Sequence, residues 1–221
     1  FSNALSQAIL PTFSTQALED GRERLKLTLS WGLRAVFFVL LPATAGFMVL
    51  AGPLISTLFG GGKFDAYSAH LTSQALFFYS IGLFAYGATK ILQSCFFSLK
   101  DTVTPTKVAF VALIMNVILN SLLMFPLKIA GLALATSISG INSFLILFVI
   151  LKKRLGDFQT KEIAVSFLRI LASSACMAFA CYFVSKNVFL GNSFIHKALN
   201  LSSSIISGLI VYIISCFVFK V

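Results

Sequence analysis

Six apolar segments of about 20 residues constrain this chain more than any other feature of its sequence. They cover residues 30–50, 71–99, 106–125, 128–151, 165–184 and 199–219. A helix of this length crosses the ~30 Å hydrocarbon core of a bilayer, whereas the strands of a membrane barrel are shorter and alternate in polarity. Only 11% of the residues are charged, against about 25% in a soluble domain. The sequence therefore predicts an all-α integral membrane protein with six transmembrane helices.

The polar segments between the apolar runs divide the chain into five parts. Residues 1–13 are predicted to be the end of a helix, which we call the helix stub, and residues 14–29 a polar linker. Residues 30–151 hold the first four spans, the last two of which are joined by a tight corner at Pro126-Leu127. A basic loop, residues 152–164, leads to the final two spans in residues 165–221.

The distribution of positive charge predicts the orientation in the membrane. Of the 17 Lys and Arg residues, ten fall in the linker, in the loops after the second and fourth spans, and in the C-terminal tail, and four fall on the opposite side. Because cytoplasmic loops carry an excess of Lys and Arg, the linker and the C-terminus are predicted to be cytoplasmic. The basic residues lie between apolar runs rather than on one face of a domain, so the net charge of +10 does not indicate nucleic-acid binding.

Lys90 is the one lysine that lies well inside an apolar run. It is about nine residues from the cytoplasmic end of its span, or roughly 13 Å along the helix. A charge near the centre of a membrane helix costs roughly 2.5–3.5 kcal/mol, so Lys90 either extends to the cytoplasmic headgroups or lines a polar cavity and meets an anionic substrate. Arg34, four or five residues into the first apolar run, is open to the same two interpretations.

Three polar residues of the third and fourth spans are candidates for a cation site. Asn116 and Asn120 share one helix face, and the tight corner brings Thr136 of the next span to a depth close to Asn120. Their oxygens could bind Na⁺, or the residues could simply form hydrogen bonds between helices. No catalytic Ser/His/Asp or Cys/His set and no pair of intramembrane carboxylates is present, so an enzyme is not predicted.

Five phrases of the sequence together resemble one family, the MurJ/MviN lipid II flippases, whose superfamily includes MATE drug exporters and polysaccharide flippases. The resemblance covers nearly the whole chain, is strongest over residues 31–139, and has its most specific part in the KDTVTP turn that follows FFSL. The phrases are ILPTFS at 9–14, WGLRAVFFVLLPATAGFMVLAGPLISTLF at 31–59, GKFDAYSA at 62–69, KILQSCFFSLKDTVTPTKVA at 90–109 and FPLKIAGLALATSIS at 125–139.

The resemblance implies a fold and a function. Such flippases have fourteen helices in two lobes around a cationic cavity, and rocking of the lobes moves the lipid-linked peptidoglycan precursor from the inner to the outer leaflet of the bacterial inner membrane. Two additional C-terminal helices form a groove for the lipid tail. The chain resembles part of the second lobe of such a MATE-like transporter plus these two helices. It is therefore expected to need the first lobe and not to transport alone.

The resemblance also implies roles for the candidate residues. Lys90 and Arg34 match basic residues of the family and are expected to bind the pyrophosphate of lipid II. Asn116, Asn120 and Thr136 match a cation site in which Asn120 replaces a carboxylate, so coupling to Na⁺, to protons or to the membrane potential stays open. The expected partners are lipid II, membrane lipids and the first lobe. The alternatives are a polysaccharide or drug exporter, or a membrane assembly subunit that transports nothing.

Overall fold

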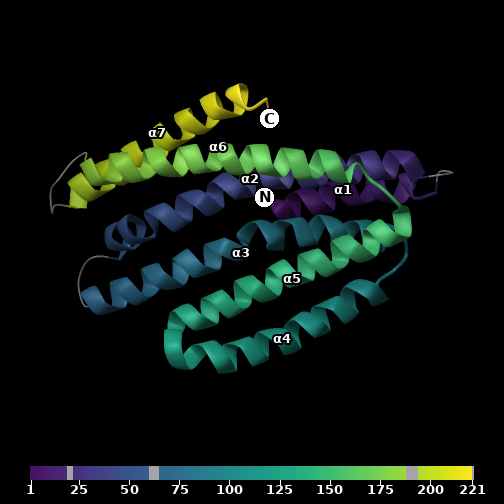
Figure 1. Cartoon of the computed structure of the whole chain (residues 1–221), viewed down its shortest axis with the longest axis horizontal. Helices are drawn as coiled ribbons and strands as arrows, with labels where there is room; N and C mark the ends of the chain where they lie inside the picture. The colour runs from purple at the N-terminus through teal and green to yellow at the C-terminus, as the bar shows by residue number, and fades with distance from the viewer. Residues whose placement is uncertain (19–21, 60–64, 188–193, 221) are drawn as a thin grey trace.

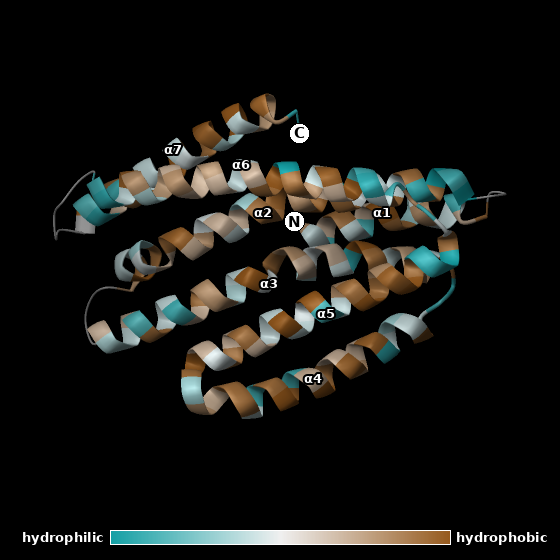
Figure 2. Cartoon of the chain, in the orientation of Figure 1, coloured by the Kyte–Doolittle hydropathy of each residue, from teal (hydrophilic) through white to brown (hydrophobic). Residues whose placement is uncertain are grey.

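The computed structural model describes residues 1–18, 22–59, 65–187 and 194–220, and the secondary structure in these ranges is helical throughout. Six of its seven helices, α2 to α7, are long and apolar enough to cross a membrane, which confirms the predicted fold class. Many of the hydrophilic residues lie near the helix ends (Figure 2). The helices are α1 (Ser2–Gln16), α2 (Glu23–Leu58), α3 (Ala66–Ser98), α4 (Val103–Leu127), α5 (Ile129–Leu155), α6 (Thr160–Asn187) and α7 (Phe194–Val218) (Figure 1).

The helices extend further than the apolar runs. Only residues 17–22 separate α1 from α2, so much of the linker predicted over residues 14–29 is helical. Only residues 156–159 separate α5 from α6, so most of the basic loop predicted over residues 152–164 is helical as well. Charged residues such as Glu, Lys and Arg are good helix formers, so they end the apolar run without ending the helix.

The corner between α4 and α5 lies one residue later than predicted. Pro126 and Leu127 still belong to α4, and the chain turns at Lys128, whose φ is 50°. The two helices then approach so closely that a Cβ on Gly131 would lie 2.1 Å from the carbonyl oxygen of Leu123. The corner is therefore a tight hairpin whose close approach requires glycine at position 131.

The packing is centred on α2, α3 and α5. Helix α3 packs on α2 and α5, α6 packs on α2, α1 packs mainly on α3, and α7 packs on α6 and α2 (Figure 1). Helix α4 packs on α5 and barely touches α3, and only Pro105 and Val108 of its residues are buried. The largest fully buried side chains are Phe13, Phe37, Phe96, Phe158, Leu25, Leu29, Leu33, Ile91, Leu92, Leu147, Leu151 and Ile170.

A close crossing of α3 and α5 sets the position of the residues that follow on α3. A Cβ on Gly82 would lie 2.7 Å from the Cα of Ser137, so the two backbones are nearly in contact. The Ser137 hydroxyl donates to the carbonyl of Phe78 (2.6 Å) and accepts from the Gly82 N–H (3.2 Å). Small residues and hydroxyls commonly join membrane helices in this way. The crossing holds Tyr86 and Lys90, one and two turns later, beside α5.

The turn after α3 has a regular helix-ending geometry. Lys100 has a φ of 58° and donates its N–H to the carbonyl of Phe97 (3.0 Å). The next N–H, that of Asp101, reaches back to the carbonyl of Phe96 (3.0 Å). These two bonds form a Schellman motif, with lysine at the position where glycine is usual. The turn therefore satisfies the last carbonyls of α3 before the chain enters α4.

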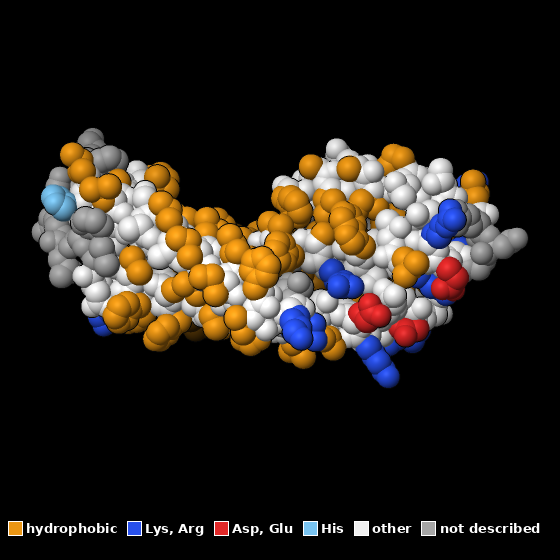
Figure 3. Space-filling view, turned by 90° about the horizontal axis from the view of Figure 1, so that it is seen from above, with side chains coloured by type: hydrophobic (Ala, Val, Ile, Leu, Met, Phe, Trp, Pro, Cys, Tyr) orange, Lys and Arg blue, Asp and Glu red, His pale blue; other side chains and the backbone are white. Residues whose placement is uncertain are grey.

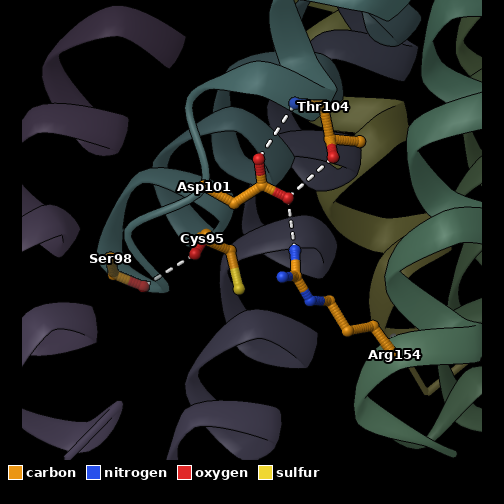
Figure 4. A network of polar contacts seen from close by, with 5 residues as sticks. All are labelled: Cys95, Ser98, Asp101, Thr104 and Arg154. Atoms are coloured by element: carbon orange, nitrogen blue, oxygen red, sulfur yellow. Dashed lines mark hydrogen bonds and ion pairs between the residues drawn. The ribbon is translucent and has the colours of Figure 1, made fainter.

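The Asp101 carboxylate connects three helix ends. It accepts hydrogen bonds from the N–H (2.9 Å) and the hydroxyl (2.7 Å) of Thr104 in the first turn of α4, and Arg154 at the end of α5 donates to it (Figure 4). The hydrogen bonds from Thr104, together with Arg154, hold the pKa of Asp101 at about 2, below its ordinary 3.8. Asp101 thus caps α4 and ties the turn to α5.

Helix α2 continues through Pro42, and α7 compensates for the hydrogen bond that this proline removes. Pro42 has no N–H, so the carbonyl of Phe38, four residues earlier, lacks its donor within the helix. The hydroxyl of Tyr212 on α7 donates to that carbonyl at 2.7 Å, and Tyr212 itself is buried. An unpaired carbonyl is costly inside a bilayer. The Tyr212 bond therefore stabilises both the path of α2 and the position of α7.

We predict that Asp101→Ala destabilises the chain by about 0.5–2 kcal/mol, the usual loss for a helix N-cap. Because folding lowers the pKa of Asp101, its contribution is fully present above the unfolded pKa of about 3.9 and is lost as the pH falls through about 2. Thermal unfolding in detergent, followed by circular dichroism, measures the effect. The difference from wild type should shrink over this pH range.

The control for this prediction is Arg154→Gln. It removes only a half-exposed ion-pair partner, and such pairs contribute about 0–1 kcal/mol, so it should cost less than Asp101→Ala. An Asp101→Ala protein that unfolds at the wild-type temperature would show that the cap contributes nothing.

We also predict that Tyr212→Phe costs about 1–3 kcal/mol, because it leaves the buried carbonyl of Phe38 without a donor. Pro42→Ala restores an N–H that can bond the same carbonyl within α2. In a double-mutant cycle, Tyr212→Phe should therefore cost less in the Pro42→Ala background than in wild type. Unfolding in detergent measures all four proteins, and strictly additive effects would contradict the prediction.

Candidate functional site

A polar pocket of about 370 Å³ lies between α3, α4 and α5. We call it the polar pocket. It lies within segments that are otherwise apolar enough to cross a membrane. Its polar lining residues are Tyr86, Thr89, Lys90 and Gln93 of α3, Asn116 of α4, and Thr136, Ser139 and Ser143 of α5.

Lys90 lies in the wall of the polar pocket, and its side chain is exposed. It also lines a second pocket of about 330 Å³, with Ser2 and Asn3 of α1 and Leu40 of α2. Among the residues that the structure describes, none forms a hydrogen bond or an ion pair with Lys90. The geometry fits the cavity interpretation of Lys90, and substrate binding by this residue stays a prediction.

Several residues around Lys90, among them Tyr86, Gln93 and Gly140, were not singled out in the sequence. The Tyr86 hydroxyl donates to the carbonyl of Thr136 (2.9 Å), and Gly140 leaves room for the Tyr86 ring, because a Cβ there would lie 2.7 Å from it. The signal that could have found them is spacing: Tyr86, Lys90 and Gln93 recur at helical intervals, so they share one face of α3. A single tyrosine or glutamine in a membrane helix indicates no site by itself. Only their position on the same helix face as Lys90 marks them as candidate pocket residues.

The three candidate cation ligands are brought together. The Asn116 Nδ2 donates to the Thr136 Oγ1 (3.4 Å), and the Asn120 Nδ2 donates to the Asn116 Oδ1 (2.9 Å). The Asn120 Oδ1 is buried and has no hydrogen-bond partner. In the described part of the chain no group of three or more His, Cys, Asp or Glu side chains could hold a metal ion. The cluster is therefore a hydrogen-bonded set of neutral side chains with one free oxygen.

Arg34 does not line the polar pocket together with Lys90. It lines a different pocket, of about 460 Å³, with Trp31 of α2, Ser166 of α6 and part of α1. Its guanidinium Nη1 lies 3.6 Å from the carboxylate of Glu162 in the first turn of α6, and both side chains are about half exposed. Lys90 does not line this pocket, so the two predicted substrate-binding residues occupy separate places in the structure.

An apolar groove of about 490 Å³ runs between α2, α6 and α7. The resemblance implies a groove at the last two of these helices, and α2 is an addition that the sequence did not predict. We call it the apolar groove. Phe38, Pro42 and Leu50 of α2 form one wall. The other walls include Met177 of α6 and Tyr212 of α7, two residues that the sequence analysis did not single out.

Comparison with known proteins gives one consistent result. The model of the family "Lipid II flippase MurJ" matches residues 1–215. The chain is 34% identical over 156 residues to the lipid II flippase MurJ of Burkholderia cenocepacia, which covers 71% of this chain and 30% of the relative. The chain is 29% identical over 221 residues to the lipid II flippase MurJ of Thermosipho africanus, and this match covers 99% of this chain and 42% of the relative.

A solved structure gives the same result. The structure of a lipid II flippase MurJ in an inward closed conformation superimposes on this chain with a TM-score of 0.81 and 27% sequence identity. It covers 99% of this chain and 43% of the other, so the chain spans less than half the length of the relatives it matches. The match over nearly the whole chain confirms the resemblance seen in the sequence. The chain belongs to the MurJ lipid II flippase family.

Proposed function

We propose that this chain contributes the polar pocket to a flippase that moves lipid II from the inner to the outer leaflet of a bacterial inner membrane. The observation that carries the proposal is Lys90, an unpaired cation among hydroxyl and amide side chains within a membrane-spanning segment. The family is named for a transport function, and we assign no catalytic step to the chain.

The chemistry of the pocket suits a phosphorylated polar headgroup. A lysine ammonium attracts a pyrophosphate as a point charge, and charge-assisted hydrogen bonds are the stronger ones. The hydroxyls and amides of Gln93, Asn116 and Ser143 can replace water around a headgroup that leaves the interface. The apolar groove is a separate surface, between α2, α6 and α7.

We propose that the linker over residues 14–29 and the C-terminus are cytoplasmic, with Lys90 in the inner half of the membrane. The excess of Lys and Arg in these segments supports this orientation. Figure 3 supports it too, because most of the charged side chains visible on that face lie in its right-hand half. Helix α4, which packs almost only on α5, leaves a side of the polar pocket for the first lobe to complete.

We predict that Lys90→Ala, in a full-length flippase carrying this chain as its C-terminal part, reduces lipid II export at least about tenfold. A hydrogen bond to a charged group contributes about 1.5–3 kcal/mol, and 1.4 kcal/mol corresponds to a factor of ten. Growth of a flippase-depleted strain and the accumulation of lipid II measure the effect. Lys128→Ala, which removes a lysine at the corner between α4 and α5, is the matched control.

Other outcomes would favour the alternative functions. Normal growth with Lys90→Ala would contradict a substrate role for Lys90. Unchanged lipid II levels in cells that lack the protein would favour a polysaccharide or drug exporter. A loss of complex assembly without a loss of transport would favour an assembly subunit.

We further propose that Asn116, Asn120 and Thr136 bind a monovalent cation that couples to transport. The free, buried Oδ1 of Asn120 supports this proposal, because buried polar atoms rarely lack a partner. Amide and hydroxyl oxygens suit Na⁺, and the cluster supplies both.

We predict that Asn120→Asp strengthens Na⁺ binding by adding a carboxylate, and that Asn120→Leu abolishes it. A cation that binds only the folded state raises the unfolding temperature with concentration. Unfolding in NaCl, compared with choline chloride at equal ionic strength, should therefore show the largest Na⁺-specific rise for Asn120→Asp. Identical curves in the two salts for both wild type and Asn120→Asp would contradict the cation site.

A further inference from the structure

The Arg34–Glu162 ion pair lies at one end of a surface that two adjoining cavities form along α2. Arg34 lines the pocket between α1, α2 and α6, and Phe38 and Val39 line both that pocket and the apolar groove. The two cavities therefore join side by side along α2. A charged pair lies at one end of this surface, and hydrocarbon side chains line the rest.

The apolar groove has the shape and chemistry to hold a hydrocarbon chain. It follows α2 from Phe38 to Leu54, about 24 Å at 1.5 Å per residue, which is most of the ~30 Å hydrocarbon core. The one hydroxyl in its lining, that of Tyr212, already donates to the carbonyl of Phe38. The groove therefore offers no free polar group to a headgroup, and a headgroup would have to sit at its charged end.

The charged end presents both signs of charge. The Nη1 of Arg34 and the Oε2 of Glu162 are 3.6 Å apart, beyond hydrogen-bonding distance, and the two side chains are 44% and 58% exposed. An exposed ion pair of this kind contributes little to stability, so a ligand that carries both charges can separate the two side chains at small cost. A guanidinium binds phosphate through two parallel N–H bonds, and a carboxylate accepts hydrogen bonds from a primary ammonium.

The depth of the pair fits a lipid headgroup. Glu162 lies in the first turn of α6, immediately after the short non-helical segment that follows α5. Trp31, three residues before Arg34 on α2, is 59% exposed, as is typical of tryptophan at a membrane interface. A purely anionic lipid would meet the negative charge of Glu162, whereas a zwitterionic headgroup complements both side chains.

We propose that Arg34 and Glu162 bind the headgroup of an aminophospholipid of the bilayer, with its phosphate on Arg34, its ammonium on Glu162 and one acyl chain in the apolar groove. The site is separate from the polar pocket and does not depend on the flippase function proposed for that pocket. It gives Arg34 a ligand of the surrounding membrane rather than the transported molecule.

The chain contains one tryptophan, Trp31, which lines the same pocket as Arg34, so its fluorescence reports on this site. The chain is reconstituted into vesicles in which brominated phosphatidylethanolamine, phosphatidylglycerol or phosphatidylcholine replaces its unbrominated form, and quenching gives relative binding constants. Wild type should prefer phosphatidylethanolamine over phosphatidylglycerol by about threefold, the effect expected of one exposed ion pair. It should also prefer phosphatidylethanolamine over phosphatidylcholine, whose quaternary ammonium cannot donate a hydrogen bond.

Two variants and a control make the test specific. Glu162→Gln should reverse the preference toward phosphatidylglycerol. Arg34→Gln should weaken the binding of all three lipids, because each carries the phosphate, and should keep the order of preference that Glu162 sets. Lys128→Gln removes one charge at the corner between α4 and α5 and should leave wild-type selectivity. Equal quenching by the three lipids in wild type, or a wild-type preference for phosphatidylglycerol, would overturn the proposal. Circular dichroism confirms that each variant is folded before quenching is measured.

Discussion

The rest of the structure depends on the requirement that polar groups within a bilayer find partners inside the protein. Seven helices satisfy most of the backbone, and Tyr212 supplies the donor that Pro42 removes from α2. Six buried side-chain oxygens of the described residues lack a hydrogen-bond partner, and two of them are those of Thr89 and Asn120. Thr89 lines the polar pocket, and Asn120 is bonded to Asn116, which lines it as well. Two of the six unpartnered oxygens thus lie in the polar pocket or next to it.

The polar pocket and the apolar groove are formed by different sets of helices. The polar pocket lies among α3, α4 and α5, and the apolar groove lies among α2, α6 and α7. The packing of α2 on α3 separates the two surfaces. Lys90 therefore lines the polar pocket without lining the apolar groove.

The sequence predicted what depends on composition and short spacing, and missed what depends on helix rotation. Six spans follow directly from apolar length, and the cluster of Asn116, Asn120 and Thr136 follows from i, i+4 spacing and a tight hairpin. Hydropathy does not encode how far each helix turns about its own axis, so it could not show that Arg34 and Lys90 line different pockets. The Tyr212 bond joins residues 174 positions apart, and its only local sign was Pro42.

Helix α4 is held in place mainly by α5, through the Asn116–Thr136 hydrogen bond as well as at its two ends. The Asp101 carboxylate holds its first turn to the end of α5, and the Lys128 corner holds its last turn to the start of α5. Along the length between these points it barely touches α3, across the polar pocket. A shift of α4 away from α3 that keeps its packing on α5 would therefore widen the pocket at little cost in contacts with α3. Of the three helices around the pocket, α4 is the one that a single neighbouring helix mainly holds in place.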